Sequence, residues 1–252
     1  MIPQLASSIK SLCCGVLVIG LVSLTATSAY CQMDPPKNKY WFSSYEFIFS
    51  LSDIGAPDSL PQDLYSSSNM RFSGFINSQY QYHYDINRNF GLMTGFGFRN
   101  VGFINNIGDT IKLKQRVYSF GVPVAMKFGK LPGGYSVTLG VEPELFFHYK
   151  QKAIYDDEKY KKMGWFSNRV NLINPSVFVD FRFKNGFFLR YKHYLLDVLV
   201  PENQSVSVGE KSVVYVPETS KMYYLSFGFS LPIEDEKDDR KRPNNDIFGF
   251  MR

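Results

Sequence analysis

The chain lacks cysteine everywhere except near its start. Its 252 residues include three cysteines, Cys13, Cys14 and Cys31. The rest of the chain therefore has no disulfide and no thiolate metal site. The acidic run 156–158 lacks the ligand spacing of a calcium loop, so the sequence predicts no metal and no cofactor.

Long hydrophobic runs are missing after the N-terminal segment. Mean hydropathy is −0.18, and no later apolar stretch is long enough for a membrane helix, which excludes a helical membrane bundle. A transmembrane β-barrel is not excluded, because its strands are only half apolar. The net charge of +5 is spread along the chain, so the sequence predicts no nucleic-acid partner.

Residues 1–31 have the parts of a secretory signal peptide. Lys10 supplies the positive charge, 12–24 is the apolar core, and small residues follow. We expect cleavage after Ala29 or after Cys31. An uncleaved anchor and a lipoprotein lipidated at that cysteine are the alternatives, although a tyrosine precedes the cysteine where a small residue is usual.

What the chain does have is aromatic residues, 17% of the total, in segments that alternate apolar and polar residues. Such period-two segments are typical of half-buried β-strands. We expect eight strands, at about 40–51, 70–85, 90–104, 112–129, 135–150, 170–184, 186–199 and 221–231. Their connections tend to alternate between short turns with hairpin residues and long polar loops, as in outer-membrane barrels.

The bulky apolar face of these strands indicates lipid outside. A soluble lipocalin-like barrel is also eight-stranded, but it is apolar inside. An eight-stranded barrel has an interior just wide enough for side chains, too narrow for so many Phe and Tyr. We therefore predict an all-β fold, an eight-stranded antiparallel up-and-down transmembrane β-barrel over 40–232. A short segment, 32–39, precedes it and a polar tail, 233–252, follows it into the periplasm.

Several strands also resemble a family. The run 118–128 (YSFGVPVAMKF), 140–143 (GVEP), 187–197 (FFLRYKHYLLD) and the closing strand around Tyr223 resemble the outer-membrane β-barrel proteins of Bacteroidota, the PorT-like or porin family group. The resemblance spans about 40–232 and implies an outer-membrane location more than transport. The chain departs from that pattern by continuing for 20 residues past Pro232.

Charged residues fall on the lumen face of the predicted strands. We expect a lumen charge network of Arg99, Glu142, Glu144, Arg190, Asp180 and Arg182, with the two glutamates pairing with Arg99 or Arg190. Buried charges must be paired, so the network is interpreted as a structural plug. A gate in a narrow small-solute pore is the alternative.

The histidines are candidates for lipid A-modifying chemistry. Strand parity places His83 and His148 in the lumen and His193 toward lipid. No serine and acid accompany a histidine at the spacing that nucleophilic catalysis needs. We therefore expect a non-enzymatic protein with no catalytic residue, and a lipid A-modifying enzyme is the second alternative.

The outer loops and the tail are the remaining candidates for function. Loop 151–169 mixes lysines with the aromatic residues Tyr155, Tyr160, Trp165 and Phe166, a possible contact site for a partner, an acidic glycan or anionic headgroups. We expect a monomeric barrel in the outer membrane, in contact with its lipid and lipopolysaccharide, with a structural, adhesive or interaction role. A periplasmic partner for the tail is a further hypothesis.

Overall fold

The computed structural model describes residues 38–55, 69–107, 111–204, 206–208, 211–213 and 217–233. The predicted signal peptide, most of the 32–39 segment and the tail beyond Ile233 lie outside these residues. Apart from one short 3₁₀ helix, the described elements are strands: β1 Lys39–Gly55, β2 Arg71–Ser73, β3 Ser78–Asp85, β4 Phe90–Ile107, β5 Ile111–Gly121, β6 Val124–Gly129, β7 Ser136–Tyr155, β8 Glu158–Trp165, β9 Ile173–Arg182, β10 Phe187–Tyr194, β11 Val206–Val208, β12 Lys211–Val213 and β13 Thr219–Ile233. Among these residues there is no helix with the length and apolarity to span a membrane.

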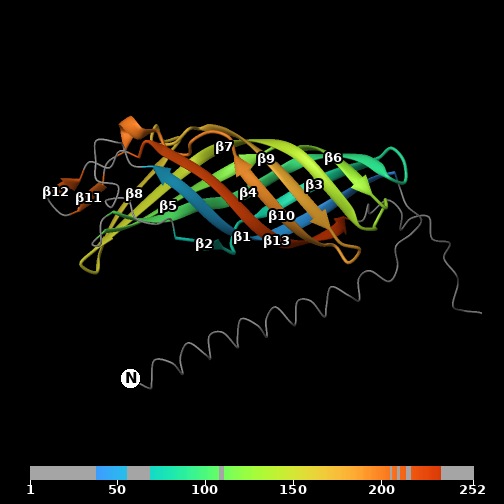
Figure 1. Cartoon of the computed structure of the whole chain (residues 1–252), viewed down its shortest axis with the longest axis horizontal. Helices are drawn as coiled ribbons and strands as arrows, with labels where there is room; N and C mark the ends of the chain where they lie inside the picture. The colour runs from blue at the N-terminus through green and yellow to red at the C-terminus, as the bar shows by residue number, and fades with distance from the viewer. Residues whose placement is uncertain are drawn as a thin grey trace, which may run out of the picture.

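Eight strand positions close into a ring. Antiparallel pairing runs in the order β13-β10-β9-β7-β5-β4-β3-β1, and β1 pairs back to β13 from Trp41–Ile233 to Gly55–Thr219. β2 shares one position with β3, and β6 shares another with β5. This confirms the predicted eight-stranded antiparallel barrel. Figure 1 shows it lengthwise, with β8, β11 and β12 at one end and the short hairpin turns at the other.

Two of the predicted strands are interrupted. Between β2 and β3, Ile76 has a φ of 61°, an uncommon conformation for a β-branched residue that breaks the strand. Between β5 and β6 stands Pro123, which has no N–H to donate to the ladder. Both strands resume in the same ring position, so the ring stays closed across the two breaks.

The outward face is an apolar band, as the alternation predicts. Large apolar side chains from every position of the ring are exposed there: Trp41, Tyr45, Tyr80, Leu92, Phe96, Phe98, Val124, Met126, Leu139, Val141, Val177, Phe181, Leu189, Tyr191, Leu225 and Leu231. A water-facing barrel would not expose a continuous apolar surface of this extent. The band is the surface that a barrel presents to lipid.

The inward face pairs glycines with long side chains. Gly121 lies opposite Glu144, Gly140 opposite Phe178, and Gly228 opposite both Glu46 and Phe188. A Cβ on Gly121 would stand 2.9 Å from Cγ of Glu144 and closer still to a carboxylate oxygen of Glu142. The narrow lumen therefore accommodates large groups only where the neighbouring strand has none.

A β-bulge in β7 reverses the faces of its outer part. Tyr118 lies opposite His148, but the next residue, Ser119, lies opposite Phe146, which leaves Phe147 as the extra residue. Beyond a bulge the inside–outside alternation shifts by one. Tyr149 is consequently buried inside at 1% exposure, whereas His148 faces outward. The predicted lumen position of His148 is wrong for this reason.

The connection predicted as loop 151–169 is mostly a β-hairpin. β7 and β8 pair from His148–Trp165 to Tyr155–Glu158. The two-residue turn is made by Asp156 and Asp157, both at positive φ, the geometry of the tight hairpin turns that favour Asp. The hairpin extends the wall past the ring on one side (Figure 1).

The outer part of the interior is apolar, contrary to the expectation of a polar lumen throughout. Its members are Ile48, Val101, Phe103, Ile107, Ile111, Leu113, Val117, Phe146, Tyr149, Ala153, Val170, Tyr194, Val198, Leu199, Val206, Met222 and Tyr224. In β5 the inward residues Leu113 and Val117 alternate with outward Lys114 and Arg116, so the polarity of the faces is the reverse of that in the apolar band. Above the band the barrel has the apolar interior and polar exterior of a soluble protein.

Candidate functional site

The centre of the lumen holds the predicted charge network. Nε of Arg99 donates to Glu46 at 2.6 Å and its Nη1 to Glu142 at 2.5 Å; Nη1 is also 3.7 Å from Glu144. Because β1, β4 and β7 supply these residues, the network links strands that do not all adjoin. The two glutamates that we expect beside Arg99 or Arg190 lie beside Arg99, and Glu46 adds a third carboxylate.

Arg190 pairs with a different acid from those predicted. It binds Asp180 on the neighbouring strand β9 through Nε at 2.5 Å and Nη2 at 2.8 Å. Its Nη1 donates to Gln79 across the lumen at 3.0 Å. This two-point arrangement is the strong form of an arginine–carboxylate contact.

Lys192, a cation that strand parity predicts on the lumen face, completes the network. Its Nζ contacts Glu142 at 2.7 Å and also Glu144, and the hydroxyl of Tyr194 donates to Glu144 at 3.0 Å. The period-two pattern put Lys192 on the lumen face. What pattern alone cannot show is which cations and acids from distant strands share one level of the barrel.

Arg182 lies apart from this cluster, at the mouth with the short turns. It donates to Gln81 at 2.6 Å and lies over the rings of Phe42 and Phe188. Nearby, Nζ of Lys127 is 2.6 Å from Asp85. The six predicted network residues therefore divide into a central group of five and one residue of a second group at the mouth.

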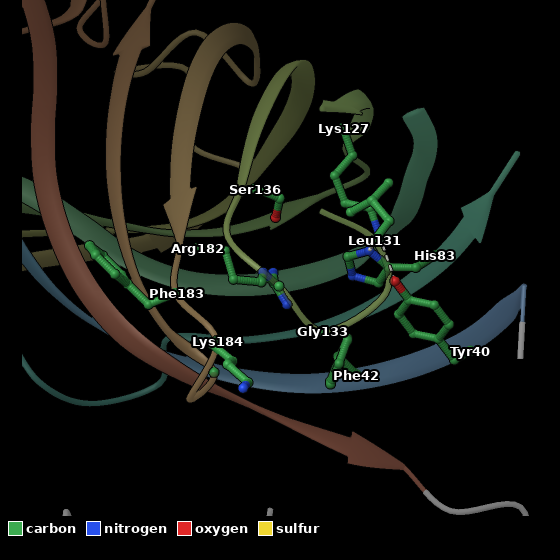
Figure 2. Close-up of a pocket in the computed structure, with 12 residues that line it drawn as sticks. Tyr40, Phe42, His83, Lys127, Leu131, Gly133, Ser136, Arg182, Phe183 and Lys184 are labelled. Carbon is green, nitrogen blue, oxygen red and sulfur yellow. Dashed lines mark hydrogen bonds between the residues drawn. The ribbon is translucent and has the colours of Figure 1, made fainter. Parts of the chain in front are cut away.

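The mouth also encloses a small cavity. Figure 2 shows Lys127, His83 and Tyr40 on one side of it and Arg182 on the other. The cavity has a volume of about 20 Å³, room for about one water molecule. His83 bridges Gln81 and Lys127 at 3.2 and 3.3 Å; since an ammonium only donates, the contact with Lys127 requires the histidine nitrogen to be an acceptor.

The lumen charges are buried and balanced. Among the residues that the structure describes, the buried charged ones are five cations (Arg99, Lys127, Arg182, Arg190, Lys192) and five acids (Glu46, Asp85, Glu142, Glu144, Asp180), each at most 8% exposed. Their formal charges cancel. A continuous water-wide channel would leave its lining side chains accessible to water, which the side chains of the central group are not.

The predicted outer contact residues lie on or beside the β7–β8 hairpin. Tyr155, Trp165 and Phe166 are exposed, and Tyr160 lines a cavity of about 140 Å³ with Gln151, Ala153, Lys161 and Lys162. Trp165 packs against the ring of His148 at 4.8 Å between centroids. The hairpin therefore presents aromatic and basic groups together at the long-loop end.

Neither remaining histidine has a catalytic setting in the described chain. His193 faces outward and stacks on Tyr223 at 6.3 Å, while His148 lies between Tyr118 and Trp165. Across the ranges that the structure describes, no three His, Cys, Asp or Glu residues gather as metal ligands do.

Comparison with solved structures finds other proteins of this general kind. The chain is similar to Ail, the attachment invasion locus protein of Yersinia pestis (11% identity, 77% of this chain and 99% of that one, TM-score 0.33). It is also similar to Neisserial surface protein A (13%, 78% and 100%, 0.39) and to OprG of Pseudomonas aeruginosa (10%, 78% and 97%, 0.34).

No protein-family model and no curated protein matches the chain. Because the TM-scores are under 0.5, these structural similarities do not indicate a function for the chain. The assignment of the fold rests on the strand pairing and the closed ring described above.

Proposed function

We propose that the chain is an integral outer-membrane β-barrel protein with a structural, adhesive or interaction role. The observation that carries this proposal is the combination of an apolar exterior band with a closed, charge-balanced interior. The short turns, the start of β1 and the end of β13 face the periplasm, and the β7–β8 hairpin faces outward from the cell. Residues 1–31 act as the signal peptide. The resemblance to the Bacteroidota family implies the same outer-membrane location.

Location and folding are tested together. Expressed with its own N-terminus, the protein should fractionate with the outer membrane and migrate faster in a gel when unheated than when boiled, as a folded barrel does. Recovery of the protein in the soluble periplasmic fraction, with unchanged migration on heating, would contradict the proposal.

A closed lumen separates this proposal from a small-solute pore. Since Arg99, Glu142 and Lys192 seal one level with bonds between strands, the purified barrel should give no discrete conductance steps in planar bilayers. An Arg99→Ala and Lys192→Ala double variant serves as the comparison. Regular single-channel steps from the unaltered protein would favour the pore.

A non-enzymatic role is also part of the proposal. Incubation of the barrel with lipid A should leave the acyl chains unaltered, because no described histidine has a serine or acid arranged for nucleophilic attack. Mass spectrometry of the recovered lipid is the measurement. Loss or addition of an acyl chain would replace this proposal with the lipid-modifying alternative.

A further inference from the structure

The outer face of the β5–β7–β8 wall carries cations in successive rows. In the register, Arg116 lies beside Lys150, Lys114 beside Lys152 and Lys161, and Lys112 beside Ile154 and Lys159. We call these seven cations (Lys112, Lys114, Arg116, Lys150, Lys152, Lys159 and Lys161) the basic face. Successive rows stand about 6.6–6.8 Å apart along the strands.

An aromatic row lies directly below the basic face. Tyr118, His148 and Trp165 are in register across the same three strands, with ring centroids 5.4 Å and 4.8 Å apart. Below them the outward residues are apolar, beginning with Phe120 and Leu145. Aromatic side chains at the edge of the apolar band mark the boundary between the hydrocarbon and the headgroups. The cations therefore begin at the level of the headgroups and face sideways, into the membrane plane.

Nothing in the described chain neutralises the basic face. No described carboxylate is within ion-pair distance of its seven side chains, and the outward neighbours on β4 are Gly102, Ile104 and Asn106. The acids Asp156 and Asp157 stand at the hairpin tip, beyond the last row. Like charges directly opposite each other destabilise a sheet.

Protection of an exposed sheet edge does not account for the arrangement. Lysines do guard edge strands against unwanted pairing, and β8 pairs with no described strand besides β7. However, five of the seven cations lie on β5 and β7, which are paired on both sides. The pKa of Lys152 lies below its ordinary value, through partial desolvation and through repulsion from Lys159, Lys114 and Lys161, so the crowding reaches the middle of the wall.

We propose that the basic face binds the phosphate groups of an anionic glycolipid in the outer leaflet. The proposal rests on the proposed function, since it requires the long-loop end to face outward from the cell. Phosphates at the headgroup level supply the charge that the face lacks, and the aromatic row holds that face at their depth. A phosphorylated lipid fits better than a soluble polyanion because the cations face sideways from the aromatic row rather than along the barrel axis.

The test compares two triple variants of the full-length protein. Lys114→Gln, Lys152→Gln and Lys161→Gln remove the middle row; Lys39→Gln, Lys130→Gln and Lys184→Gln remove the same charge at the short-turn end. Binding of bisphosphorylated lipid A in detergent is followed by the fluorescence of Trp165 in a Trp41→Phe background. Dephosphorylated lipid A and heparin are the comparison ligands.

The middle-row variant should bind bisphosphorylated lipid A about a hundredfold more weakly, since each of its three lost lysines contributes roughly a fivefold factor near an anionic surface. The short-turn variant should bind it unchanged, affinity should fall with salt, and dephosphorylated lipid should bind weakly. Lys152→Gln alone should weaken binding about fivefold. This single variant replaces the triple variant in the test if the triple variant does not fold.

Equal affinity of the middle-row variant and the unaltered protein, or equal affinity for the two lipids, would overturn the inference. Loss of heparin binding with lipid binding retained would assign the face to a soluble polysaccharide and also overturn it. Heat-dependent migration and outer-membrane fractionation of each variant distinguish failure of this inference from failure of the proposed function. A barrel that reaches the outer membrane but binds lipid A equally well with and without the middle row contradicts this inference and not the proposed function.

Discussion

At the scale of the residue, Lys192 is the cation that two buried glutamates share. Replacing it by Met leaves Glu142 and Glu144 with one remaining contacting cation, Arg99, among fully buried side chains. Breaking a buried ion pair by removing one partner costs about 3–5 kcal/mol. We expect Lys192→Met to lower the free energy of unfolding by that amount, measured by urea titration of the barrel in lipid vesicles.

Lys221→Met is the matched control for Lys192→Met. Its Nζ is 3.2 Å from Asp197, but its side chain is 39% exposed, and exposed ion pairs contribute about 0–1 kcal/mol. Similar losses in the two variants would mean that the lumen network is not the main source of the effect.

The glycines of the lumen are a second residue-level feature with a measurable consequence. In Gly121→Ala the new Cβ meets carboxylates that the network already holds in place, so they cannot move aside freely. We expect a loss of about 1–3 kcal/mol from overpacking. Gly164→Ala is the control, because its nearest neighbour would be Ser167 at 3.7 Å; a larger loss there than at Gly121 would contradict the explanation.

At the scale of the element, the β7–β8 hairpin is an addition to the ring. Joining Gln151 to Lys162 through Asn-Gly removes 152–161 at a position where the two strands are already in register. The ring below Tyr118 and His148 keeps all its partners. The shortened protein should still reach the outer membrane and should lose less stability than Lys192→Met, by the same urea titration. Failure to assemble would show that the hairpin is needed for folding.

The elements also show how far the sequence can predict this structure. The alternation of apolar and polar residues located all eight strand positions. It also assigned the inward and outward faces of seven of these strands correctly, and the residue types placed Arg99, Glu142 and Glu144 together. The remaining strand, β7, contains the bulge at Phe147. One extra residue there exchanges the inward and outward faces of the rest of the strand, and no residue type marks the position of the bulge in the sequence. The hairpin was predicted as a loop because its lysines read as a polar connection.

The sequence also marks the change of polarity along β5. In 112–117 the apolar residues occupy inward positions and the cations outward ones, the opposite of 118–128. This change marks where the strand leaves lipid, and it indicates an apolar interior above that level. Which of the lumen charges pair with one another depends on strand stagger, which local pattern does not contain.

At the scale of the whole molecule, the two tryptophans should report its position in the bilayer. Trp41 lies near the short turns and Trp165 in the aromatic row, at opposite ends of the apolar band. In the single-tryptophan variants Trp41→Phe and Trp165→Phe, lipids brominated near the headgroup should quench the remaining tryptophan more strongly than lipids brominated near the chain ends. Stronger quenching from the chain ends would place the membrane elsewhere on the barrel.

The reversal of polarity in β5 and in β7 also determines what insertions and deletions the protein tolerates. Removing one residue of β5 above the aromatic row would turn inward side chains such as Leu113 outward and bring the lysines into the apolar interior. Removing two keeps every side chain on its face but moves the charged level by two residues, about 5 Å in height for a strand tilted near 45°. Related chains should therefore differ here by even numbers of residues, and each such step would adapt the same barrel to a membrane of different thickness.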